Sequence, residues 1–126
     1  MGEIRVRGRN ELLTGQGVQT SGMTRSEVAL GENSCAVEVR TQPGAVSGWH
    51  HHGDHDTYGY VVSGKLRLEF GPGGSDTVEA ECGDYFVVPA RTIHRESNPT
   101  SEEQVLVGFR VGDGPTVFNL DGPEGS

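Results

Sequence analysis

Short alternating runs of apolar and polar residues recur along the chain and predict strands rather than helices. The clearest run covers residues 104–111, where Val105, Val107, Phe109 and Val111 occupy every second position. Side chains that alternate in this way point to opposite faces of a strand. Further strands are predicted at residues 28–30, 34–41, 58–62, 66–70, 77–81, 84–88, 92–95 and 116–120.

The turn-forming residues between these runs indicate how the strands are connected. The 126 residues include 20 Gly and 6 Pro, and no window carries the apolar stripe of an amphipathic helix. Short strands with turns roughly every 8–12 residues predict an all-β sandwich or barrel. We expect a single domain over residues 1–126, with a core at about 25–120, an N-terminal arm at 1–24 and a flexible tail at about 121–126.

Charge restricts the classes of partner. The chain carries 18 acidic and 10 basic side chains, which gives a formal net charge of −8. Nucleic acids and anionic membranes favour clustered Lys and Arg, so neither is expected as a partner. No apolar stretch approaches the roughly 20 residues of a membrane span, and residues 1–10 lack the apolar segment of a signal peptide. We therefore expect a cytoplasmic protein in which Cys35 and Cys82 stay reduced.

The histidines gather in one segment of the chain. His50, His51, His52 and His55 lie within six residues, and the fifth histidine is His94. In an extended segment, His50 and His52 point to one face while His51 points to the other. Imidazole is a ligand for Fe, Ni, Cu, Zn and Mn, so such a pair forms half of a metal site. The other interpretation is a solvated polar loop at the mouth of a barrel.

Two motifs around these histidines match a known family. The first consists of Gly44, His50, His52 and Gly64, and the second of Gly83, Pro89, His94 and Asn98. Together they resemble the two motifs of the cupin superfamily, with Arg91 where the family has a glycine. The resemblance implies a small jelly-roll barrel of two antiparallel sheets with a metal in its open end. It also implies that His50, His52 and His94 ligate a divalent transition metal, such as Fe, Mn, Ni or Zn.

One ligand position departs from the family pattern. The resemblance places a glutamate ligand seven residues before Gly64, where this chain has Thr57. The first interpretation is a site of three histidines, as in cupin iron dioxygenases that cleave β-diketones. In the second, His55 replaces the glutamate, since positions 55 and 57 share a face of an extended strand. In the third, Asp56 reaches the metal, although an extended strand would turn it to the opposite face.

Several functions are consistent with such a site. The leading hypothesis is a mononuclear metal enzyme, similar to an oxygenase, that acts on a small oxygen-rich molecule. A non-catalytic module that binds or senses a small molecule is one alternative. Another is a metal-free epimerase or isomerase, with His50 or Tyr58 as acid or base. We also expect a homodimer formed through edge strands, because pairing removes an exposed sheet edge.

Two other positions have structural interpretations. Gly59 shares a face with Thr57 and either enlarges the cavity near the metal or marks a close backbone approach. Arg91 is interpreted as half of a surface ion pair, with contact to an anionic substrate as the alternative.

Overall fold

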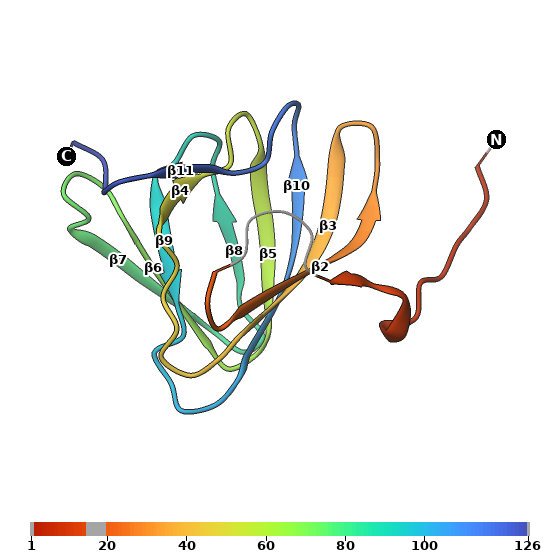
Figure 1. Cartoon of the computed structure of the whole chain (residues 1–126), viewed down its shortest axis with the longest axis horizontal. Coiled ribbons are helices and arrows are strands. Elements are labelled where there is room, and N and C mark those ends of the chain that lie inside the picture. The colour runs from red at the N-terminus through yellow and green to blue at the C-terminus, as the bar shows by residue number, and fades with distance from the viewer. Residues whose placement is uncertain (1, 15–19, 126) are drawn as a thin grey trace.

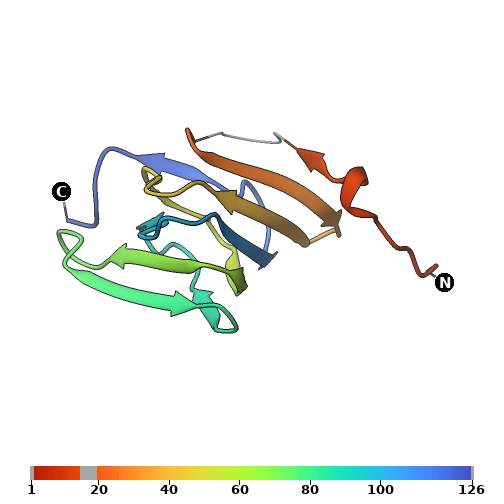
Figure 2. The same ribbon diagram turned by 90° about the horizontal axis from the view of Figure 1, so that it is seen from below.

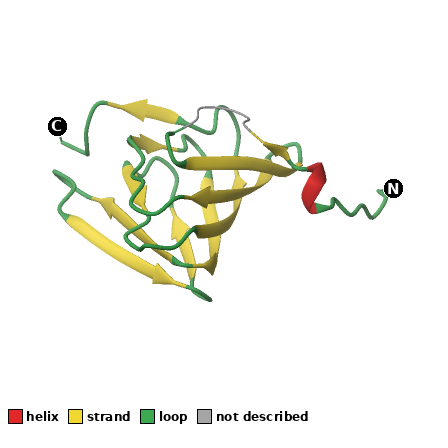
Figure 3. Cartoon of the chain, turned by 60° about the horizontal axis from the view of Figure 1, so that its bottom comes forward, coloured by secondary structure: helices red, strands yellow, loops and turns green. Residues whose placement is uncertain are grey.

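The computed structural model describes residues 2–14 and 20–125, and Figure 3 shows that most of these residues lie in strands or the loops between them. The only helix in this part of the chain is the short 3-10 turn η1 (Arg9–Glu11). The first six strands are β1 (Leu13–Thr14), β2 (Met23–Leu30), β3 (Ser34–Thr41), β4 (Trp49–His51), β5 (Asp56–Ser63) and β6 (Lys65–Phe70). The others are β7 (Asp76–Glu81), β8 (Tyr85–Val88), β9 (His94–Ser97), β10 (Gln104–Val111) and β11 (Phe118–Leu120).

The strands form two antiparallel sheets. The larger sheet has the order β1-β2-β3-β10-β5-β8, and the smaller has the order β11-β4-β9-β6-β7. In Figure 1 the smaller sheet lies on the left and the larger on the right. Most neighbours within a sheet are distant in sequence, since β10 pairs with both β3 and β5. This arrangement is a double-stranded β-helix, or jelly roll, and it confirms the predicted all-β fold with two antiparallel sheets.

The core contains the apolar side chains that face inward from the two sheets. Leu66 and Leu68 are buried on β6, while the alternate positions of that strand carry charged side chains. They pack in one cluster with Val39, Val61 and Leu106 from the larger sheet. Burial of such a side chain contributes about 1.5–3 kcal/mol each. The apolar contacts between the sheets therefore hold the walls of the barrel in place.

Strand β10 shows that apolar alternation does not by itself identify the inner face. Leu106, Gly108 and Arg110 are buried on this strand. Phe109 and Val111, from the apolar set that makes the alternation so clear, are 54% and 50% exposed. Arg110 therefore points into the barrel, although the apolar alternation of this strand favours the opposite face as the inner one.

The two ends of the chain are arranged differently. Residues 2–8 project away from the sheets in two perpendicular views (Figures 1 and 2). The C-terminal tail contacts the turn between β6 and β7, where Gly73 donates a backbone hydrogen bond of 2.8 Å to Glu124.

Cys35 and Cys82 are free thiols. Among the described residues, no helix has the length and apolarity needed to cross a membrane.

The backbone at Arg91 explains why the family motif has a glycine there. Arg91 has a φ of 61° and is the only non-glycine residue with positive φ in the described part of the chain. This left-handed conformation costs about 1–2 kcal/mol for a residue with a side chain. The Arg91 side chain forms an exposed ion pair with Asp54, as the surface interpretation predicts.

Replacing Arg91 by glycine is expected to raise the free energy of unfolding by about 1 kcal/mol. Relief of the left-handed strain exceeds the loss of an exposed ion pair, which contributes about 0–1 kcal/mol. Denaturant unfolding measures the difference. The control is Arg91→Ala, which removes the ion pair but keeps the strained backbone and should not stabilise the protein. Equal stabilisation by both substitutions would show that the ion pair, not the backbone, governs this position.

Candidate metal centre

Three buried histidines meet between the sheets. His50 on β4 and His94 on β9 are directly opposite each other in an antiparallel pair. His52 follows the end of β4 and approaches the same two rings. The ring centroid of His50 lies 4.4 Å from that of His94 and 5.1 Å from that of His52, and His52 and His94 are 5.1 Å apart. One nitrogen of each ring lies within 4.8 Å of the others, which fits three ligands of one metal ion.

Hydrogen bonds to the backbone orient each of these rings. Nδ1 of His50 donates to the carbonyl of Gly48 at 2.9 Å. Nδ1 of His52 donates to the carbonyl of Thr116 at 2.8 Å, and Nδ1 of His94 to that of Thr92 at 2.9 Å. Because a carbonyl only accepts, each neutral ring carries its proton on Nδ1 and keeps a lone pair on Nε2. Ligating histidines are normally held in this way by a partner on the other ring nitrogen. The three rings are therefore prepared to bind a cation through Nε2.

The environment keeps these histidines neutral. Burial lowers the pKa of His52 to about 2, and the positive charge of Arg110 adds to this effect. Burial, followed by the charge of His50, lowers the pKa of His94 to about 4. The pKa of His50 is also lowered, mainly by burial. Only a neutral imidazole binds a metal, so the site needs no proton release at neutral pH.

The metal-free protein is expected to lose stability as the pH falls from about 6.5 toward 4. An unfolded histidine has a pKa of about 6.5, so in this range the unfolded chain binds protons that the folded cluster excludes. For each histidine, the free energy of unfolding then falls by up to about 1.4 kcal/mol per unit decrease in pH. Thermal unfolding of chelator-treated protein at several pH values measures the effect. His52→Ala should flatten the profile and His51→Ala should not; a profile unchanged by His52→Ala would contradict the assignment.

Two histidines near the cluster have other contacts. The ring of His51 points away and stacks on Phe118, with centroids 4.9 Å apart. His55 is buried, and its Nδ1 donates a 3.0 Å hydrogen bond to the carbonyl of His52. Among the described residues, the group of converging ligand atoms contains His50, His52 and His94 and does not include His55.

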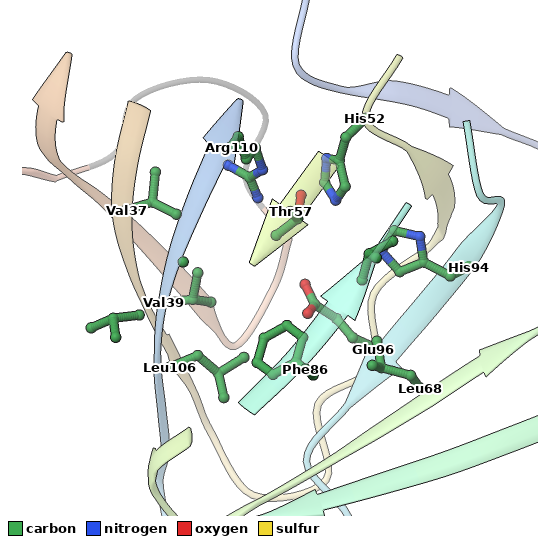
Figure 4. Close-up of a pocket in the computed structure, with 13 residues that line it drawn as sticks. Val37, Val39, His52, Thr57, Leu68, Phe86, His94, Glu96, Leu106 and Arg110 are labelled. Atoms are coloured by element: carbon green, nitrogen blue, oxygen red, sulfur yellow. The ribbon is translucent and has the colours of Figure 1, made fainter. Parts of the chain in front are cut away.

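Thr57, at the position of the family's glutamate, faces the cluster. It is buried and lines a cavity together with His52 and His94 (Figure 4). Its neighbour Asp56 accepts a 2.8 Å hydrogen bond from the backbone of Ala90 instead. Within the described residues, the converging ligand group thus contains no carboxylate.

Two charged side chains in this cavity were not identified from the sequence. Glu96 lies two residues after His94 on β9, and Arg110 lies on β10 opposite Thr57. Figure 4 shows both side chains pointing into the space beside His52 and His94. Glu96 forms an ion pair of 3.6 Å with Arg25 of β2. Glu96 could have been predicted from the sequence, because residues two positions apart, such as His94 and Glu96, lie on one face of a strand.

Unsatisfied polar atoms gather around the same space. Five buried side-chain atoms among the described residues lack a hydrogen-bond partner. Three of them surround this centre, namely His50 Nε2, Thr57 Oγ1 and Arg110 Nε. Buried polar atoms are normally satisfied, so their concentration at one point indicates a place for a ligand. The lone pair of His50 Nε2, next to two similar rings, fits a divalent transition metal.

Gly59 does not enlarge the cavity. A side chain at this position would collide with the ring of Phe86 on the neighbouring strand β8. The aromatic ring therefore fills the space that the missing side chain leaves. This supports the interpretation of Gly59 as a close approach rather than an open pocket.

Fold and site together define a small jelly roll that carries a candidate three-histidine metal centre. A family model described as the cupin domain matches residues 37–109, more than half of the chain. The chain belongs to the cupin family.

Solved structures with the same fold include several cupins. KdgF from Halomonas sp. is 29% identical, with a TM-score of 0.65 and coverage of 79% of this chain and 87% of that chain. An uncharacterized conserved protein with a double-stranded β-helix domain from Klebsiella pneumoniae is 19% identical, with a TM-score of 0.73 and coverage of 93% and 97%. Oxalate decarboxylase from Bacillus subtilis, which has Mn(II) centres, is 23% identical, with a TM-score of 0.70 over 82% of this chain and 29% of that chain. The last two share the fold alone, and no curated protein sequence has a significant match.

Proposed function

We propose that this cupin is a mononuclear metal enzyme, similar to an oxygenase, that acts on a small oxygen-rich molecule. His50, His52 and His94 would hold a divalent transition metal. The observation that carries the proposal is the orientation of the three rings, each with Nδ1 bonded to a carbonyl and Nε2 free to ligate. The Mn(II) centres of oxalate decarboxylase, which has the same fold, agree with a metal of this class. Fe, Mn, Ni and Zn all accept imidazole ligands.

Three protein ligands leave coordination positions open for a small molecule. A bound metal would supply Lewis acidity and a place for an oxygen-containing substrate beside O2. The chain contributes a narrow, mostly apolar cavity in which Phe86, Leu68 and Leu106 limit the space for water. Arg110 and Glu96 supply charged groups that a substrate would meet there.

The metal-free epimerase is the weaker alternative. Tyr58, one of its two proposed acid or base groups, is 48% exposed on the outer face of the larger sheet. It pairs with Phe109 and Val87, away from the three histidines. A module that binds or senses a small molecule would keep the metal and show no turnover.

Metal analysis and oxygen uptake test the proposal together. Protein made without a histidine tag or metal column is expected to contain about one Fe or Mn per chain. Oxygen consumption is then measured with β-diketones, flavonols, thiols and keto acids. We expect uptake with one of these classes and its loss in His94→Ala. Bound metal without uptake would favour the binding module, and absence of metal would favour the epimerase.

We also propose a homodimer located in the cytoplasm, with a small molecule rather than nucleic acid or a membrane as partner. The net charge of −8 supports the choice of partner. A second copy that pairs through the edge strand β8 would cover the apolar side chains exposed on it, Tyr85 and Val87. Light scattering coupled to gel filtration should give twice the mass of the chain, and Tyr85→Glu should shift it toward the monomer.

A further inference from the structure

Arg110 is a buried cation whose charge is only partly balanced: burial lowers its pKa, and the nearby carboxylate of Glu96 partly offsets this effect. The Arg110 side chain projects from β10 into the cavity and is only 9% exposed. Its Nε has no hydrogen-bond partner, and within the described chain no carboxylate forms an ion pair with it. Across the ladder, the side chain of Cys35 also interacts with the guanidinium. A buried charge of this kind is costly unless a partner compensates it.

The other charges in the cavity do not fully cancel that of Arg110. Glu96 is shared between two cations, since it pairs with Arg25 at 3.6 Å and also raises the pKa of Arg110 against the effect of burial. The three histidines are held by backbone carbonyls as Nδ1–H tautomers whose Nε2 lone pairs face the centre, so they supply no anion. One positive charge therefore remains, and a divalent cation at the histidines would add two more. The cavity as a whole favours an anion.

The position of Arg110 indicates where the anion would lie. Arg110 is directly opposite Thr57 on the adjacent strand, and the side chains of such pairs start about 5 Å apart. The hydroxyl of Thr57 is also buried without a hydrogen-bond partner. A guanidinium and a hydroxyl that face one space present donors suited to the two oxygens of a carboxylate. Figure 4 shows this space between Arg110, Thr57 and His52.

The volume of the cavity limits the size of the group. About 30 Å³ is available beside Arg110, room for about two waters. The two oxygens of a carboxylate match this number of water positions.

We propose that Arg110 is the receptor for the carboxylate of a small organic acid, which occupies the space next to Thr57 where related sites hold a protein carboxylate. The substrate itself thus restores the negative charge that Thr57 does not provide. This proposal rests on the proposed function, since it names the substrate class of the same site. It makes Arg110 a specificity-determining residue.

Acetate, with acetamide as its uncharged analogue, tests the proposal. Binding is measured by NMR titration of the metal-free protein and of the protein loaded with Zn²⁺. Wild type is expected to bind acetate in both forms, more tightly with Zn²⁺, and to bind acetamide at least about 10-fold more weakly. Arg110→Met should weaken acetate binding about 10-fold or more and leave the Zn²⁺ content unchanged. Arg40→Met is the matched control, because Arg40 of the same sheet pairs with Glu38 and Glu103 at the surface.

Thermal unfolding separates a binding role from a structural one. Removal of Arg110 leaves Glu96 paired with Arg25 alone, so Arg110→Met should have a higher unfolding midpoint than wild type without acetate. Acetate should stabilise only wild type and Arg40→Met. Equal acetate binding by wild type and Arg110→Met would overturn the proposal, as would a marked loss of stability in Arg110→Met and Arg110→Gln alike. Failure to bind Zn²⁺ would refute the metal centre, while Arg110-dependent acetate binding in the metal-free form would still support the receptor.

Discussion

His94→Ala is expected to lower metal affinity at least about 100-fold, whereas His51→Ala should leave it unchanged. His94 offers its Nε2 to the centre, and removal of a ligand is more costly than loss of a group that only orients one. His51 differs because its ring points away and stacks on Phe118. Competition with a chromophoric chelator gives the affinity for Zn²⁺ of each variant.

His55→Ala provides a second comparison within the same segment. His55 is buried close to the site, but its Nδ1 is bonded to the carbonyl of His52 and it lies outside the converging group. We therefore expect this variant to keep its metal. A loss about as large as that of His94→Ala would make His55 a fourth ligand, and an equal loss in His51→Ala would show that the assignment of strand faces is wrong.

Thr57→Glu is expected to tighten metal binding about 10-fold or more and to abolish the binding of acetate. A glutamate here would add an oxygen ligand beside the three nitrogens and place a carboxylate opposite Arg110. The engineered side chain would then occupy the place proposed for the substrate carboxylate. Chelator competition measures the first effect, and NMR titration with acetate measures the second.

Thr57→Gln is the control for charge in this experiment. It adds nearly the same volume without a negative charge, so it should give a much smaller gain in metal affinity. If Thr57→Glu left metal affinity unchanged, the side chain at position 57 would not reach the ion. If the glutamate variant still bound acetate as wild type does, the anion would lie elsewhere in the protein.

The fold was predictable because local sequence signals and the final topology agree. The alternation of Leu66 and Leu68 with charged residues gives the inner face of β6 directly. Strand ends were less accurate: β2 begins at Met23 rather than at residue 28, and β9 runs from His94 to Ser97 rather than over 92–95. Hydrogen bonding to the neighbouring strand extends or shortens a strand beyond its own hydrophobic pattern. A single sequence does not show which strand that neighbour is.

The charged half of the site was harder to predict than the histidines. His50 and His52 stand out through their spacing, and the family motif adds His94. Arg110 did not stand out, because apolar residues on the outer face of β10 gave the stronger alternation. Its meeting with Thr57 depends on the register between β10 and β5, strands about 50 residues apart in sequence. Such long-range pairing leaves no local signal in a single chain.

Diffraction from crystals of the Zn²⁺-loaded protein, recorded at the zinc absorption edge, tests the metal centre most directly. The anomalous difference map should show one peak per chain, about 2.1 Å from Nε2 of His50, His52 and His94. A peak held by His51 or His55 in place of one of these, or no peak between the three rings, would contradict the three-histidine centre.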